Sequence, residues 1–142
     1  MRPRSVIRAA RRGSASIEFA LTLPIAILLI SAVADYGWYL ALQTQTLQAV
    51  GDGARHGATV SSEATPSPEE AATAHTQTVL AGLGIPCDVE DDCQFEANID
   101  DVGGLQVLRV GVTFNYSPIT GLVPNPEKIT AETVMAMEDQ VN

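Results

Sequence analysis

A single carboxylate, Glu18, stands directly before an uncharged and mostly aliphatic run at residues 19–34. An ionised carboxylate costs about 2.5–3.5 kcal/mol near the centre of a bilayer and less near its interface. Ordinary membrane anchors avoid a charge at such a place. Glu18 is therefore either an acid that reaches the polar edge of the bilayer or a group with a specific function.

Cys87 and Cys93 are the two cysteines of the chain, and they enclose an acidic stretch at residues 88–92. In an exported protein they can pair and close a small loop, whereas in a reducing compartment they stay free thiols. The C-x5-C spacing without histidines is a poor zinc signal and is not a C-x-x-C redox motif. The acids, with Glu96 after them, could bind Ca²⁺ weakly, but they lack the order of an EF-hand loop. We therefore expect no metal site and no cofactor.

Catalytic groups are not evident in the sequence. His56 and His75 are expected to be isolated surface or packing residues, because neither has a second histidine, a nucleophile or a carboxylate at ligand spacing. The serines, including Ser14 and Ser16, lack the context of a nucleophile elbow. We expect a protein that is not an enzyme and has no small-molecule substrate.

Charge divides the chain of 142 residues into two parts. Five arginines precede residue 14, and beyond Gly13 three basic residues face all 17 acids, a formal charge of −14. This distribution is typical of a cytoplasmic N-terminal segment and an exported body. The arginine-rich segment could also contact anionic lipid. Nucleic-acid binding by the body is not expected, because it has no basic patch to neutralise phosphates.

A membrane-spanning helix is expected near the N-terminus. Residues 19–34 form a helix of about 24 Å, which is short for a bilayer core of about 30 Å. A span over residues 17–39 is workable, with aromatic side chains at its outer end: Tyr36, Trp38 and Tyr39. Pro24 should kink this helix locally because it lacks an N–H group.

The helical pattern continues beyond the predicted span. Apolar residues recur at helical spacing: Tyr36, Leu40, Leu47, Val50 and Ala54. Three glycines lie in the last part of this pattern, at Gly51, Gly53 and Gly57. Each weakens a helix by up to about 1 kcal/mol relative to alanine but permits close approach of another backbone. The segment formed by Gly51, Gly53, Ala54, Arg55 and Gly57 is thus either a packing face or a fraying helix end near Gly57. A packing face would meet neighbouring subunits or the chain's own head.

The remaining pattern predicts a small α+β head. Residues 61–67 form a linker, and Ser67-Pro68-Glu69-Glu70 starts a second helix that runs to about Ala81. Strands are predicted at residues 93–99, 107–116 and 129–137, with a hairpin turn at Gly103-Gly104. The fold class is therefore α+β: a long N-terminal transmembrane helix, a second helix and an antiparallel sheet of about three strands. We divide the chain into a leader (1–13), a long helix (14–59), a linker (60–67) and a head (68–142).

Two segments carry a family resemblance. Gly13, four residues, Glu18-Phe19 and an apolar helix resemble the processing site of type IV prepilins. With the downstream Gly53-Ala54-Arg55 element, the chain looks like the TadE-like pseudopilins of tight-adherence (Tad) pilus systems. The resemblance is specific at residues 13–19 and 53–58 and loose in the strands.

The resemblance implies a structural role in assembly of an adhesive pilus, or in a related secretion process. A prepilin peptidase would cut between Gly13 and Ser14. Glu18, followed by Phe19, would then pair with the new N-terminal amine of a neighbouring subunit. The implied partners are the peptidase, the major pilin, a sister pseudopilin, the inner-membrane platform and membrane lipid. The protein would cross the bacterial inner membrane once, with its C-terminal domain in the periplasm, and would stay at the platform or enter the extracellular pilus.

Two other export routes compete with this interpretation. Ala32-Val33-Ala34 resembles a signal-peptidase site before Asp35, and cleavage there would release a periplasmic binding module. The same module could instead stay signal-anchored, with the acidic loop between the cysteines as its contact surface. Arg11-Arg12 is a weak twin-arginine signal, because the residues that follow do not extend that motif.

Overall fold

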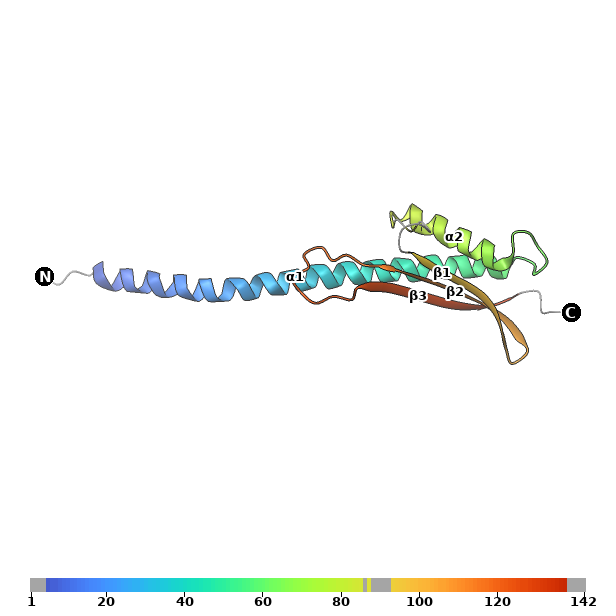
Figure 1. Cartoon of the computed structure of the whole chain (residues 1–142). Coiled ribbons are helices and arrows are strands. Elements are labelled where there is room, and N and C mark those ends of the chain that lie inside the picture. Colours follow the sequence, from blue (N-terminus) through green and yellow to red (C-terminus); the bar gives the residue numbers. More distant parts are fainter. Residues whose placement is uncertain (1–4, 86, 88–92, 138–142) are drawn as a thin grey trace. The chain divides into compact units, whose positions relative to one another are not determined.

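The computed structural model describes residues 5–85, 87 and 93–137, with the backbone alone for residues 5–14. In chain order the elements are α1 (Ser5–Ala58), α2 (Pro68–Gly82), β1 (Gln94–Val102), β2 (Leu105–Asn115) and β3 (Lys128–Ala136), shown in Figure 1. The protein is α+β, as the sequence predicts. Its contacts define two compact units, Met1–Gly37 with Pro118–Asn125, and Trp38–Ser117 with Pro126–Asn142.

The first unit contains the N-terminal part of α1. The helix begins at Ser5, within the predicted leader, and continues through Gly13 and Pro24. One glycine costs a helix only about 0.5–1 kcal/mol relative to alanine, so the small-residue segment does not end it. The side chains after it are widely exposed, with Leu21 at 69% and Ile30 at 70%. This part of α1 is long and apolar enough to cross a membrane.

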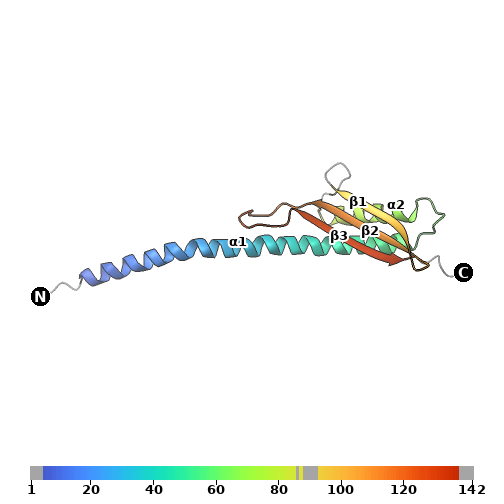
Figure 2. The ribbon, with the colours of Figure 1, turned by 60° about the horizontal axis from the view of Figure 1, so that its bottom comes forward.

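The second unit is built on an antiparallel sheet in the order β1-β2-β3. In Figure 2 the three strands lie side by side. Gly103 and Gly104 form the turn between β1 and β2 with φ of 68° and 87°, a backbone conformation that favours glycine. The Gly104 N–H donates to the Asp101 carboxylate at 2.9 Å, which stabilises the turn.

Alternation along β2 determines which face of the sheet forms the core. Leu108, Val110, Val112 and Phe114 are buried, whereas Arg109 between them is exposed. The buried side chains cluster with Ala49, Val50 and Ala54 of α1 and with Ala72 and Leu80 of α2. Fully burying a leucine or valine stabilises a fold by about 1.5–3 kcal/mol. The distal part of α1 is therefore a structural element of the head.

α2 begins with a complete capping box. The Ser67 hydroxyl accepts a hydrogen bond from the Glu70 N–H at 3.3 Å, and the Glu70 carboxylate accepts one from the Ser67 N–H at 3.2 Å. These two bonds satisfy donors that would otherwise be unpaired at the helix start. Leu83 is the C-cap, one residue beyond the end of α2 at Gly82.

Candidate functional site

The predicted processing and assembly residues lie on the N-terminal part of α1. Gly13 and Ser14 are within the helix, and their side chains are outside the described residues. Glu18 and Phe19 are exposed, Phe19 at 64%. The backbone carbonyl of Glu18 accepts a hydrogen bond from the Thr22 hydroxyl at 3.0 Å. This segment of the helix therefore presents a carboxylate and a phenyl ring next to each other on an apolar surface.

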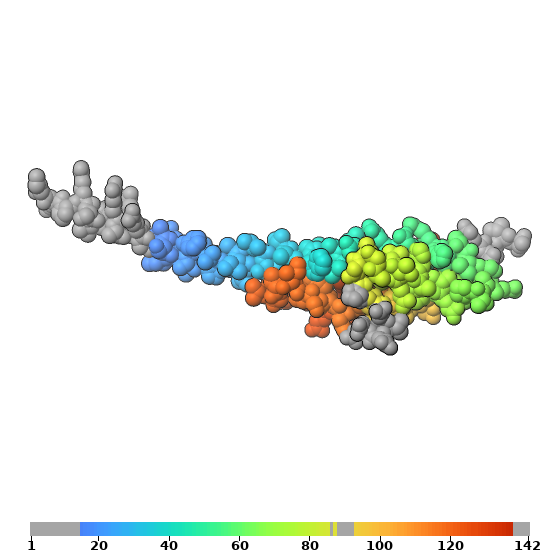
Figure 3. Space-filling model, turned by 90° about the horizontal axis from the view of Figure 1, so that it is seen from above, coloured from blue at the N-terminus to red at the C-terminus, as the bar shows by residue number. Residues whose placement is uncertain are grey.

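The glycine-rich segment of α1 packs against α2 of the same chain (Figure 3). A Cβ built on Gly53 would lie 1.9 Å from the Thr76 Oγ1 atom. One built on Gly57 would lie 2.6 Å from the carbonyl oxygen of Pro68. Ala54 is fully buried in the core. The chain's own head, one of the two expected partners, thus occupies this face, and the helix ends next to it at Ala58.

A second face of the same segment stays open. Nothing lies within 4 Å of a Cβ built on Gly51, and Leu47 is 49% exposed. Arg55 is exposed and forms an ion pair with Asp52 at 3.4 Å. Leu47, Gly51 and Arg55 are four residues apart and so share one helical face. Among the described residues of the glycine-rich segment, Gly51 and Arg55 therefore lie on the open face, whereas Gly53, Ala54 and Gly57 are covered.

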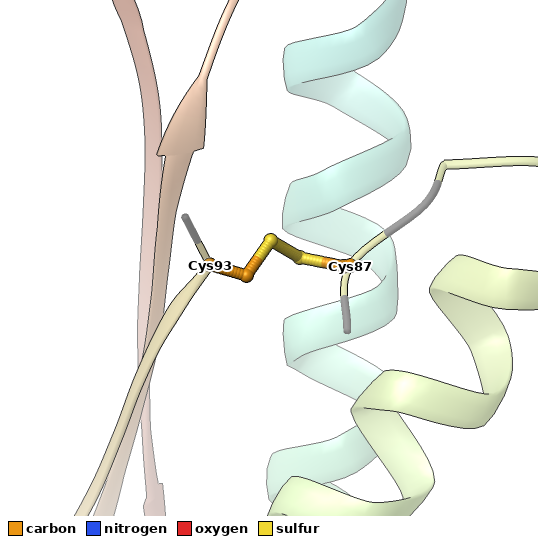
Figure 4. Close-up of a disulfide and its surroundings, with 2 residues drawn as sticks. All are labelled: Cys87 and Cys93. Carbon is orange, nitrogen blue, oxygen red and sulfur yellow. A yellow bond between two sulfur atoms is a disulfide. The ribbon is translucent and has the colours of Figure 1, made fainter. Parts of the chain in front are cut away.

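Cys87 and Cys93 form a disulfide between the segment after α2 and the start of β1 (Figure 4). Both are buried, with 7% and 6% exposure. Residues 88–92, the acidic loop considered for Ca²⁺, are outside the described residues, and Glu96 is exposed on β1. Among the residues that the structure describes, no three His, Cys, Asp or Glu side chains are grouped as a metal site.

The two histidines are not isolated, contrary to the prediction from their sequence context. The rings of His56 on α1 and His75 on α2 stack with centroids 4.7 Å apart and planes 27° apart. The expected isolation is wrong, because helix packing, and not sequence spacing, brings the two rings together, whereas the expected packing role is confirmed. In sequence His56 precedes Gly57 and His75 precedes Thr76, so the stacked rings belong to the α1–α2 contact.

Asp35 is the residue whose role the sequence does not reveal. Its carboxylate is fully buried and accepts hydrogen bonds from residues 118–125 of the loop between β2 and β3. Thr120 donates its N–H to Oδ1 at 2.7 Å and its hydroxyl to Oδ2 at 2.6 Å. The Gly121 N–H and the Asn125 amide also donate to Oδ2, at 3.2 Å and 3.4 Å.

Further contacts hold the same loop on α1. The Tyr36 hydroxyl donates to the carbonyl oxygen of Pro124 at 2.9 Å. Gly121 has a φ of 63°, which a residue with a side chain rarely adopts. The Asn125 amide also donates to the Val123 carbonyl at 2.8 Å, and its Oδ1 atom is buried without a hydrogen-bond partner in the described structure. An acid within an apolar run, and a distant uncharged Pro/Gly loop, are the two sequence signals of this contact.

The predicted aromatic belt is divided by the structure. Trp38 is 45% exposed and Tyr36 is 44% exposed. Tyr39 instead packs edge-on against Tyr116, with ring centroids 5.4 Å apart and planes at 76°. Tyr39 thus contributes to the core of the head, because the head begins at this turn of α1.

The fold combines a helix whose N-terminal part is long and apolar enough to cross a membrane with a small α+β head that includes the distal part of the same helix. The model of the TadE-like protein family matches residues 13–55, so this segment is TadE-like. The match associates the chain with tight-adherence pilus systems, and the family is structural. The matched segment includes Gly13, Glu18, Phe19 and Arg55 and ends before α2 and the sheet. No curated protein and no solved structure matches the chain.

Proposed function

We propose that the protein is a pseudopilin that is cut by a prepilin peptidase between Gly13 and Ser14 and takes part in assembly of a tight-adherence pilus. It is anchored once in the inner membrane with its C-terminal domain in the periplasm. Its proposed partners are the peptidase, the major pilin, a sister pseudopilin, the inner-membrane platform and membrane lipid. Adhesion and related secretion are the processes that such an assembly serves.

The observation that carries this proposal is the division of α1 into a covered part and an exposed part. Ala49, Val50 and Ala54 are fully buried in the head, whereas Ile17 and Phe19 are 65% and 64% exposed. An apolar helix of this length needs lipid or other apolar helices around it. A subunit that moves from a bilayer into a helical bundle exchanges one of these environments for the other.

Glu18 supplies the charge in the proposed assembly step. Cleavage after Gly13 creates an amine at Ser14, and the carboxylate of Glu18 attracts the amine of a neighbouring subunit. The attraction is strong in an apolar environment, where an unpaired carboxylate is correspondingly unfavourable. The pairing therefore favours one register between neighbouring helices. The exposed face at Leu47, Gly51 and Arg55, farther along α1, is the proposed packing surface between subunits.

The experiment that tests the proposal is determination of the mature N-terminus. The protein is purified from membranes of host cells with and without prepilin peptidase, and its terminus is measured by mass spectrometry. We expect a start at Ser14 that depends on the peptidase. An intact Met1 in both hosts would contradict the processing step.

The alternative, a periplasmic module released by signal peptidase, has less support. Cleavage before Asp35 would cut α1 at a place where the helix is continuous from Ser5 to Ala58. It would also create a new terminus at a residue whose side chain is fully buried. The same measurement separates the two proposals, because release predicts a soluble protein that starts at Asp35.

A further inference from the structure

The loop that Asp35 holds has an unusual composition. Residues 117–126 contain no charged side chain, although 17 acids are distributed over the chain beyond Gly13. Ile119 and Leu122 are 63% and 59% exposed. They flank Thr120 and Gly121, whose N–H groups donate to Asp35. Two large apolar side chains thus project from a segment whose backbone is fixed on α1.

The position of Asp35 along α1 gives the depth of this loop. A hydrocarbon core needs about 20 helical residues, so a span that starts near Glu18 ends near Gly37. Asp35 and Tyr36, which both bind the loop from α1, therefore lie at the outer end of the span. The loop reaches this level because four donors converge on one carboxylate.

The hydrogen bonds also explain how an irregular segment can lie there. Backbone N–H groups at membrane depth must be satisfied within the protein, because lipid offers them no partner. Asp35 accepts from the N–H groups of Thr120 and Gly121, and the loop in turn encloses a charge that lipid would not solvate. Asp35 thus satisfies two backbone N–H groups of the loop, and the loop shields the carboxylate of Asp35 from lipid.

We propose that the β2–β3 loop is a membrane-contacting element that inserts Ile119 and Leu122 between the phospholipids of the periplasmic leaflet, beside the outer end of α1. Asp35 is the residue that holds it in this position. The proposal rests on the membrane anchoring stated above and adds a second contact with the bilayer. The occupant of the apolar surface is lipid, because the loop is attached to α1 at the level where lipid surrounds the helix.

The test places an environment-sensitive fluorophore on single cysteines of the full chain in vesicles of phosphatidylethanolamine and phosphatidylglycerol. Both native cysteines are in the disulfide, so an added cysteine is the one free thiol. The probe positions are Ile119→Cys and Leu122→Cys. Leu105→Cys is the matched control, because Leu105 is apolar and 57% exposed but lies at the end of the β1–β2 hairpin. Val33→Cys, in the span and 75% exposed, reports the anchor.

Nitroxides on the lipid acyl chains then report contact with the bilayer. We expect a blue shift and loss of fluorescence at positions 33, 119 and 122, with neither at 105. If position 33 is quenched but the emission shift and quenching at 119 and 122 equal those at 105, the loop proposal is overturned and the anchor remains intact. No quenching at 33 would overturn both. A blue shift at 119 and 122 without quenching would mean that another protein copy covers them, which also overturns the proposal.

A second variant tests the role of Asp35. Asp35→Asn removes the charge that the loop donors share, so quenching at position 122 should fall towards that at 105 while quenching at 33 stays unchanged. Thr44→Val is the control substitution, because the Thr44 hydroxyl donates within its own helix, to the Leu40 carbonyl at 2.8 Å. Unchanged quenching at 122 in Asp35→Asn would contradict the assignment of Asp35.

Discussion

Gly53 on α1 and Thr76 on α2 lie in direct contact, so that a Cβ atom added to Gly53 would stand 1.9 Å from the Thr76 hydroxyl oxygen. The same hydroxyl donates to the Ala72 carbonyl at 2.8 Å, and that carbonyl would lie 2.8 Å from the added atom. The two helices can pack at this distance only because position 53 has no side chain. The glycine-rich element of the family match is therefore, at this residue, a determinant of the head's own fold.

Gly53→Ala should destabilise the head by about 1–3 kcal/mol, the usual cost of forcing an extra methyl group into a packed core. Gly51→Ala is the matched control, since open space surrounds position 51. It should stabilise the helix by up to about 1 kcal/mol through its higher propensity. Chemical denaturation of both variants in detergent measures the difference. Equal stability of the two would show that α2 does not pack on Gly53.

Asp35→Asn should loosen the β2–β3 loop, because hydrogen bonds to a charged group contribute about 1.5–3 kcal/mol. The amides of Thr120 and Gly121, which donate to Asp35, should exchange faster with deuterium. The Gly104 amide, which donates to Asp101, should keep its rate. Hydrogen exchange followed by mass spectrometry or NMR reports all three. Unchanged exchange at Thr120 and Gly121 would mean that other contacts hold the loop.

Replacement of both Cys87 and Cys93 by serine should lower the stability of the head by about 2 kcal/mol, from the entropy of closing a short loop in the unfolded chain. The sequence separation of 6 makes this one of the smaller effects of a disulfide. Denaturation with and without reductant measures it, and the double variant should no longer respond to reductant. A variant as stable as the oxidised protein would contradict the prediction.

Arg109→Met should change stability little. The Arg109 guanidinium donates to Asp100 on β1 at 3.1 Å and also pairs with Glu132 on β3. The hydrogen bond from Asp100 and then that from Glu132 raise the pKa of Arg109. Its side chain is 45% exposed, however, and exposed ion pairs contribute only about 0–1 kcal/mol and weaken with salt. Denaturation at low and high salt checks this, and a loss that persists at high salt would indicate lost packing instead.

Glu18→Ala should leave cleavage largely intact and block pilus assembly, because it removes the partner of the new amine and keeps the apolar helix. Glu63→Ala, in the segment between α1 and α2, is the control for loss of one acid. Mass spectrometry of the terminus and electron microscopy of the cell surface provide the two readouts. Normal piliation in Glu18→Ala would refute the proposed register.

Local signals were sufficient to predict the elements. Ser67 and Glu70 form the predicted capping box, and Gly103-Gly104 forms the predicted hairpin turn. The alternation of Leu108, Val110 and Val112 identified the buried face of β2. The sheet extends β1 to Val102, beyond the predicted end at Ile99, because pairing with β2 continues to the turn. Such features depend on residues close in sequence, whose backbone preferences and periodicity are readable directly.

The sequence by itself determined the apolar helix with Glu18 at its start, the family resemblance at residues 13–19, and the α+β order of elements. Only the tertiary structure decided that Gly53 and Gly57 face the chain's own α2, that His56 stacks on His75, and that Asp35 binds a loop 85 residues away. The reason is physical: each of these contacts joins segments far apart in the chain. The packing of helices and loops selects the partner of each residue, and the spacing of residues along the sequence does not identify that partner.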